Sequence, residues 1–225
     1  MRQFISKRAI LRFIAESMEI LACSLALIFT DATTKSVISG GIVAFLGAGL
    51  FTWAGGFARM EREGRLTLGG PYRFVRHPWI LARFLMVFGV ILMSRQPLLF
   101  LGTMAALAPV YRQMTRNEDK WMDIQLGPTA AEYRALVSGF VPQFVPVKLP
   151  MSWRTMDQER FSWSRALLRR PGRGWLAYAG LVCAVVAMMV WVSNAIPVVW
   201  WRAAAALAVS AAIIWLVRDR ENHPV

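Results

Sequence analysis

The stretch VISGGIVAFLGAGLFTWAGGFA, residues 37–58, has no charged side chain in 22 consecutive positions. A helix needs about 20 mostly apolar residues to cross the hydrocarbon core of a bilayer. The stretch therefore predicts a membrane span. It contains several glycines, which suit the close approach of a neighbouring helix: Gly40, Gly41, Gly47, Gly49, Gly55 and Gly56.

Other apolar runs are long enough to span a membrane, or could pair with a neighbouring run in a helical hairpin. They lie at residues 10–29, 79–94, 97–111, 175–201 and 203–217. The first is the weakest, because it contains Arg12, Glu16 and Glu19. We expect the runs at 79–94 and 97–111 to form a helical hairpin that turns at 95–97 and extends past the bilayer edge on its basic side. The sequence thus predicts an all-α, polytopic membrane protein of about six transmembrane helices.

The composition supports a membrane protein and excludes a nucleic-acid partner. Hydrophobic residues make up 56% of the chain and the mean hydropathy is +0.44, whereas soluble domains are about 45–50% apolar. The net charge is +13. Its basic residues sit between apolar runs, which favours contact with anionic lipid over nucleic acid. Cys23 and Cys183 both lie inside apolar runs, so we interpret them as small buried hydrophobes, not as a disulfide or a metal site.

The distribution of basic residues sets the orientation. With the N-terminus inside and alternating spans, 22 of the 26 Lys and Arg residues fall on the inner side. Only Lys35, Arg95 and Arg202 fall outside, and Arg83 lies within a span. Cytoplasmic loops carry the excess of Lys and Arg. We therefore expect an integral protein of the bacterial inner membrane with both termini in the cytoplasm.

Three regions follow from these spans. Residues 1–146 form a membrane core and residues 175–225 a C-terminal transmembrane hairpin. Between them, residues 147–174 are polar and basic, with interspersed Trp153, Phe161, Trp163 and Leu167. Aromatic and basic residues in this mixture are typical of an amphipathic helix that lies on the membrane surface.

Two inner segments concentrate polar groups against the bilayer. Gly69 to Pro78 precedes the third span, and Arg112 to Gly127 follows the fourth. Pro78 suits the first turn of a helix, so the donors before it lie at a helix N-terminus, which favours an anionic group. Because the third and fourth spans are antiparallel neighbours, we expect His77 and Glu118 to reach the same membrane face.

These segments resemble a known family. Residues 70–78, GPYRFVRHP, resemble the GPYRYVRHP element of the isoprenylcysteine carboxyl methyltransferase and phospholipid methyltransferase group. Residues 116–127, RNEDKWMDIQLG, resemble its second element, R-x-E-E followed by an apolar position and F-G. Glu132-Tyr133-Arg134 and the prolines Pro142 and Pro146 resemble its tail. The resemblance covers roughly residues 52–146 and leaves the C-terminal hairpin unexplained.

The resemblance implies methyl transfer from S-adenosylmethionine to a lipid-like or hydrophobic acceptor, at a cytoplasmic cofactor pocket and without a metal. Arg73 and Arg76 suit the carboxylate of the donor, and Glu118 or Asp119 suits its ammonium group. Tyr72 or Trp79 offers an aromatic face to the sulfonium. His77 suits hydrogen bonding to the donor. We name as catalytic candidates His77, Glu118 and Arg83, and as cofactor-binding candidates Tyr72, Arg73, Arg76, His77, Glu118 and Asp119.

Each candidate also has a structural interpretation. Arg73 and Arg76 fit a basic inner loop that contacts lipid, and His77 fits a residue that stabilises the loop. Glu118 and Asp119 fit a solvated helix end, where neighbours point about 100° apart. Arg83 fits a side chain that reaches back to the inner surface, or one that meets an anionic group of the acceptor. The acceptor group itself remains open between a carboxylate, an amine and a thiol.

The chain departs from the family pattern after Pro78, and this keeps other functions open. Ile80 and Ala82 stand where the family has tyrosine and glycine, Asp119 where it has glutamate, and Leu126 where it has an aromatic residue. These changes are consistent with an altered pocket or with a non-catalytic membrane scaffold or assembly protein of the same fold. A nicotinamide-dependent membrane reductase is a further alternative, although no additional phosphate-binding loop is present.

The charge distribution predicts where reporter fusions will lie. Reporters fused at Val225 and within Thr33 to Ser36 should report opposite sides of the membrane, the first cytoplasmic, because the basic residues gather on the inner side. Activity of topology reporters that fold on one side only measures this. Both fusions on the same side would contradict the six-span arrangement.

Overall fold

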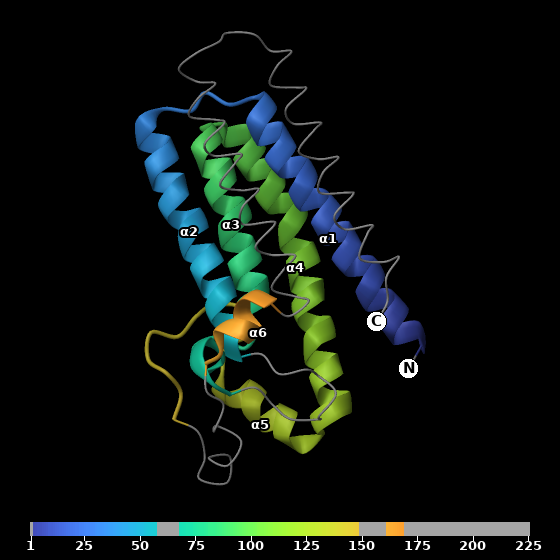
Figure 1. Ribbon diagram of the computed structural model, residues 1–225. Coiled ribbons are helices and arrows are strands. Elements are labelled where there is room, and N and C mark those ends of the chain that lie inside the picture. Colours follow the sequence, from blue (N-terminus) through green and yellow to red (C-terminus); the bar gives the residue numbers. More distant parts are fainter. Residues whose placement is uncertain (1, 58–67, 149–160, 169–225) are drawn as a thin grey trace. The chain divides into compact units, whose positions relative to one another are not determined.

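The computed structural model describes residues 2–57, 68–148 and 161–168, and all regular structure in these ranges is helical. The elements are α1 (Arg2–Ile28), α2 (Thr34–Phe57), the 3-10 helix η2 (Gly70–Arg73), α3 (Pro78–Ser94), α4 (Pro97–Leu126), α5 (Pro128–Leu136) and α6 (Trp163–Leu168) (Figure 1). The predicted all-α class is therefore confirmed over the described residues.

The apolar stretch that predicted a membrane span forms helix α2. Among the described helices, α2 is the one that is both long enough and apolar enough to cross a membrane. Helix α3 is apolar but shorter, with 17 residues. The predicted C-terminal hairpin, residues 175–225, lies outside the described residues. A total of six spans therefore stays a prediction.

Prolines fix where helices α3 and α4 begin. Pro78 and Pro97 are the first residues of these helices, where the missing N–H of proline costs no intrahelical hydrogen bond. Between the helices, Arg95 has φ +57° and makes the predicted tight turn. Helix α4 continues to Leu126, beyond its apolar part, and its extension past the bilayer edge stays a prediction. Helix α3 does not continue before Pro78, because a proline at this position disfavours the helical conformation of the preceding residue. Its extension past the bilayer edge also stays a prediction.

The chain divides into two compact units, and helices α2, α3 and α4 contribute residues to both. The described part of the first unit comprises residues 2–46 and 85–110. The turn between α1 and α2 is hydrogen-bonded to the turn between α3 and α4. The amide of Asp31 donates to the carbonyl of Ser94 at 3.1 Å, and the side chain of Gln96 donates to the Asp31 carboxylate at 2.7 Å.

Two glycines allow α2 and α3 to pack backbone against backbone in the first unit. A Cβ atom on Gly40 would lie 2.4 Å from the carbonyl oxygen of Gly89. A Cβ atom on Gly89 would lie 2.5 Å from the amide nitrogen of Ala44. Neither distance is compatible with a side chain. For Gly40, the predicted role in close helix approach is therefore confirmed.

Helix α1 buries a narrow face of small residues with one acid among them. Ala15, Glu19, Ala22 and Ala26 recur every three to four residues and are at most 5% exposed. This spacing places them on one side of the helix. The Glu19 side chain is 1% exposed, so the acid that weakened the sequence signal for this span lies inside the unit.

The described part of the second unit comprises residues 47–57, 68–84, 111–148 and 161–168. One apolar cluster of this unit consists of Leu68, Tyr133 and Val137, with partly buried Met122, Leu126 and Val147 packed around it. The C-terminal end of α2 is covered by aromatic side chains. Phe161 packs on Gly56, where a Cβ would lie 2.0 Å from its ring, and Phe57 lies 5.7 Å from Phe161 between ring centroids.

Part of the predicted interfacial segment is thus described. Residues 161–168 lead into the short helix α6, whose Ala166 approaches Gly55 of α2. Trp163 is 66% exposed and contacts Phe161 edge to face. Trp153, which we also assigned to this segment, lies outside the described residues.

The two glycine environments of α2 predict opposite effects of alanine. Gly40→Ala should lower the free energy of unfolding by about 1–3 kcal/mol, because the new methyl group collides with the backbone of α3. A Cβ atom on Gly49 would meet no atom of the described residues within 4 Å. Gly49→Ala should therefore leave stability unchanged or raise it by about 0.5–1 kcal/mol through helix propensity.

Unfolding in mixed detergent micelles, followed by circular dichroism, measures both variants. Equal effects of the two substitutions would mean that the α2–α3 crossing does not depend on the close approach at Gly40.

Candidate functional site

The segment 68–77 folds as a tight loop against the end of α2. Gly70 has φ +58°, a left-handed conformation that glycine adopts without strain. A Cβ atom at this position would lie 2.5 Å from the ring of Phe57. Pro71 then starts η2. The Gly70-Pro71 pair of the sequence element thus has a structural purpose, which is to turn the chain back beside α2.

The tail after α5 binds this loop through its backbone. The amides of Arg76 and His77 donate to the carbonyls of Ser138 and Gly139, at 2.8 and 3.3 Å. In return, the amides of Gln143 and Val147 donate to the carbonyls of Phe74 and Arg73, at 2.9 and 3.1 Å. Four hydrogen bonds over five loop residues hold the backbone that presents Arg76 and His77.

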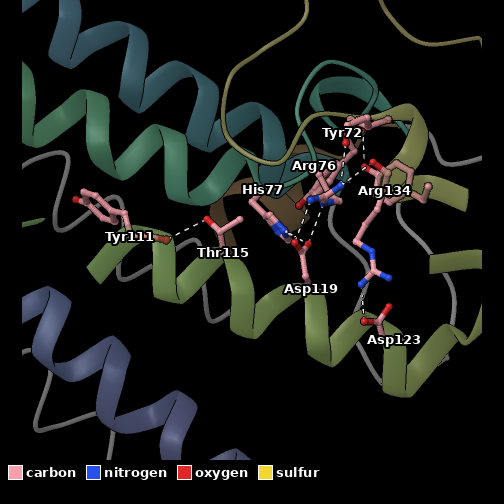
Figure 2. Close-up of polar contacts among 10 residues, drawn as sticks. Tyr72, Arg76, His77, Tyr111, Thr115, Asp119, Asp123 and Arg134 are labelled. Atoms are coloured by element: carbon pink, nitrogen blue, oxygen red, sulfur yellow. Dashed lines mark hydrogen bonds and ion pairs between the residues drawn. The ribbon is translucent and has the colours of Figure 1, made fainter. Parts of the chain in front are cut away.

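Asp119 of α4 joins the two basic side chains of the loop (Figure 2). Its Oδ1 lies 2.7 Å from His77 Nε2, and its Oδ2 accepts a hydrogen bond from Arg76 Nη2 at 3.0 Å. His77 is 7% exposed. The two polar segments therefore meet as predicted from the hairpin, and the acid that meets His77 is Asp119. Glu118, one residue earlier, is partly buried on the same helix.

The guanidinium of Arg76 also closes the end of α5. Its Nη1 donates to the carbonyls of Arg134 and Val137, at 3.2 and 2.9 Å. A helix leaves its last carbonyls without intrahelical donors, and a basic side chain there satisfies them. Arg76 Nε lies 2.9 Å from Asp119 Oδ1, within ion-pair distance but without hydrogen-bond geometry.

Gly139 makes room for this arginine. A Cβ atom on Gly139 would lie 3.0 Å from Arg76 Nη2 and 3.4 Å from the Thr115 methyl carbon. Thr115 is held one turn before Asp119 by a hydrogen bond of 3.0 Å to the carbonyl of Tyr111 (Figure 2). The guanidinium is therefore enclosed between α4, the end of α5 and the tail.

The surroundings of Asp119 keep it ionised. Burial raises the pKa of this carboxyl, but the hydrogen bond and charge of His77, together with Arg76, outweigh burial and lower it. An ionised carboxylate only accepts hydrogen bonds. His77 Nε2 must then carry the hydrogen in the 2.7 Å contact, and in the neutral imidazole Nδ1 is left as the acceptor.

A second set of polar contacts fixes Tyr72. The indole nitrogen of Trp79 donates to the Tyr72 hydroxyl, and the Tyr133 hydroxyl donates to the Tyr72 carbonyl at 2.7 Å. Burial, and to a smaller extent the charge of Asp119, raises the pKa of Tyr133, so its hydroxyl remains a donor. Trp79 in turn packs edge to face on Phe51 of α2, with ring centroids 4.4 Å apart.

The remaining candidates lie in different surroundings. Arg73 Nε donates to the carbonyl of Val147 at 3.3 Å, which ties it to the tail. Arg83 is 6% exposed inside α3. Ile80 and Ala82, where the chain departs from the family pattern, are 4% and 0% exposed. The amide of Ile80 donates to the His77 carbonyl, so it lies in the first turn of α3 as predicted.

Sequence reasoning missed the structural importance of α5 and the tail. Tyr133 and Arg134 were recognised as part of a family-like tail but received no role, and Gly139 was not singled out. Asp123 forms an ion pair with Arg134, which sequence reasoning also did not predict (Figure 2).

One comparison with known proteins finds a family model that matches the residues of this site. Residues 41–128 match the family model described as phospholipid methyltransferase. This match confirms the family resemblance, and it covers both polar segments that meet at Asp119. The family indicates a methyltransferase that acts on lipid-like substrates in association with a membrane. No curated protein and no solved structure matches the chain.

The two ion pairs of this region predict unequal effects of neutralisation. Asp119→Asn should lower the free energy of unfolding by about 3 kcal/mol, because it leaves the buried Arg76 without its counter-charge. Asp123→Asn removes the same charge from a pair whose side chains are 32% and 40% exposed. Its cost should be at most about 1 kcal/mol. Denaturant unfolding of both variants in detergent measures the difference.

The effect of Asp119→Asn on stability should also depend on pH. Because the pKa of Asp119 is lowered in the folded protein, its contribution is complete above its ordinary value of 3.8 and is lost as the pH falls through the lowered value. The stability difference between the unsubstituted protein and Asp119→Asn should shrink as the pH falls below about 4. A difference that does not change with pH would contradict an ionised Asp119.

Proposed function

We propose that the protein transfers a methyl group from S-adenosylmethionine to a lipid-like or hydrophobic acceptor at the cytoplasmic face of the membrane. The observation that supports this most strongly is the meeting of the two family elements: Asp119 of the second contacts His77 and Arg76 of the first. These elements are far apart in sequence, and both lie inside the matched segment 41–128.

The side chains gathered here fit the charges of the methyl donor. Arg73 suits its carboxylate, and Glu118 suits its ammonium group. Asp119 and Arg76 are already paired with each other, so we assign them chiefly to holding the site in shape. Tyr72 and His77, which the network fixes, complete the cofactor-binding set. When bound, S-adenosylmethionine supplies a methyl group activated by a sulfonium charge.

The protein contributes position and electrostatics more than covalent chemistry. An in-line displacement needs the attacking atom, the methyl carbon and the sulfur in line, and binding groups in a rigid arrangement supply much of the rate. His77 and Glu118 are the catalytic candidates that orient the acceptor and donor. We assign Arg83, buried in α3, to an anionic group of the acceptor. The acceptor group is a carboxylate, an amine or a thiol.

We extend the proposal to the whole chain as follows. Residues 1–146 form the methyltransferase core, residues 147–174 lie on the cytoplasmic membrane surface, and residues 175–225 form a C-terminal transmembrane hairpin. Helix α2, which is long and apolar enough to span a bilayer, supports the placement in a membrane. The basic inner loops support cytoplasmic termini in a bacterial inner membrane.

Calorimetric titration of the purified protein with S-adenosylmethionine tests the proposal. Glu118→Gln should weaken donor binding at least about tenfold, or about 1.4 kcal/mol, because it removes the charge that faces the ammonium group. Glu132→Gln is the matched control, since it makes the same change at an exposed position of α5. Glu132→Gln should leave the affinity unchanged.

Three results would contradict the proposal. Binding of NADPH without binding of the methyl donor would favour a reductase. Binding of neither molecule would favour a membrane scaffold. Equal effects of the Glu118 and Glu132 substitutions would mean that Glu118 does not contact the donor.

A further inference from the structure

The tail carries an apolar tip that no described part of the protein covers. Within residues 141–148, Phe144 is 102% exposed, Val145 73% and Val141 69%. Phe144 and Val145 lie between two prolines, at 142 and 146, and Lys148 follows as an exposed cation. Three large apolar side chains within five residues, all exposed, form a surface that water disfavours.

The backbone of this tip is anchored on both sides. The amide of Gln143 donates to Phe74, immediately before Phe144, and the amide of Val147 donates to Arg73, two residues after Val145. The Gln143 side chain also donates to the carbonyl of Leu136 at 3.2 Å. Figure 1 shows this yellow segment looping out beside the C-terminal end of α2. These hydrogen bonds fix the backbone on both sides of Phe144, so its side chain stays exposed.

The anchors place the tip near the end of the candidate membrane span. The ring of Phe74 lies 5.9 Å from that of Trp53, which is one turn before the end of α2 at Phe57. Trp53 is 40% exposed, and Trp163 is 66% exposed beside the same helix end. Tryptophans gather where a span meets the headgroup region. The end of α2 therefore marks the level of the bilayer interface.

We propose that residues 141–148 form a membrane-contact loop, in which Phe144 and Val145 enter the headgroup boundary of a bilayer rich in anionic lipid. Continuity with the end of α2 sets its depth, and Lys148 supplies charge complementary to anionic headgroups. A loop of this kind combines apolar burial with electrostatic attraction, as interfacial segments do. The proposal rests on the membrane placement of α2 given under Proposed function.

Spin-label accessibility in lipid nanodiscs tests the loop in the full chain. Labels are placed at Phe144→Cys and Val145→Cys in a chain that carries Cys23→Ala and Cys183→Ala. Oxygen, which partitions into lipid, is compared with a water-soluble nickel chelate. Phe45→Cys, at a 76% exposed position within α2, is the lipid reference. Glu132→Cys, on the exposed side of α5, is the aqueous reference.

The loop should read as interfacial. The ratio of oxygen to nickel accessibility at positions 144 and 145 should be at least about threefold above that at position 132 and below that at position 45. It should fall when phosphatidylglycerol in the nanodiscs is replaced by phosphatidylcholine, because Lys148 then loses its partner.

Other outcomes overturn the proposal and separate its premises. A ratio at 144 equal to that at 132, with a lipid value at 45, would mean that the tip faces water although α2 is in the membrane. Aqueous values at all positions would overturn the membrane placement of α2 as well. A label at 144 shielded from both reagents would mean that another segment of this chain, or a second copy, covers the tip.

Discussion

The carboxylate of Asp119 holds together the parts of the second unit that carry the candidate site. It pairs with Arg76 and His77. Arg76 in turn donates hydrogen bonds to carbonyls at the end of α5. Charged groups with so little contact with water are tolerated only when they are paired and hydrogen-bonded. The positions of the loop, α4 and α5 are thus linked, since moving any of them leaves a buried charge or carbonyl without a partner.

The contacts of Asp119 suggest different roles for the two adjacent acids of α4, one in holding the loop and one in binding the methyl donor. Asp119 and Glu118 are neighbours on α4. A helix turns about 100° per residue, so their side chains point in different directions. Asp119 faces the loop and fixes His77 through Nε2. The proposal therefore assigns donor recognition to Glu118.

Much of the fold could be predicted from local signals, whereas the tail could not. Pro78 and Pro97 indicated where helices begin, and Gly40 indicated a close contact between helices. The hairpin argument brought the two polar segments together but could not choose between Glu118 and Asp119, because it lacked the rotation of α4. The bonds of residues 138–147 to the loop join backbone groups, which every residue type possesses. Such bonds leave almost no mark on side-chain patterns, so the sequence did not predict them.

The departure from the family pattern in α3 is best understood through the same packing. Ile80 and Ala82 are buried, and the first turn of α3 is joined to the His77 carbonyl through the Ile80 amide. An apolar side chain at position 80 strengthens the packing of this turn, since burying it removes apolar surface from water or from a polar pocket. It also removes a hydroxyl from the neighbourhood of His77. The hydroxyl nearest in sequence is that of Tyr72, which Trp79 fixes from the same turn. The first turn of α3 thus carries a buried apolar side chain at position 80 and is attached to the loop by the hydrogen bond from the Trp79 indole to the Tyr72 hydroxyl.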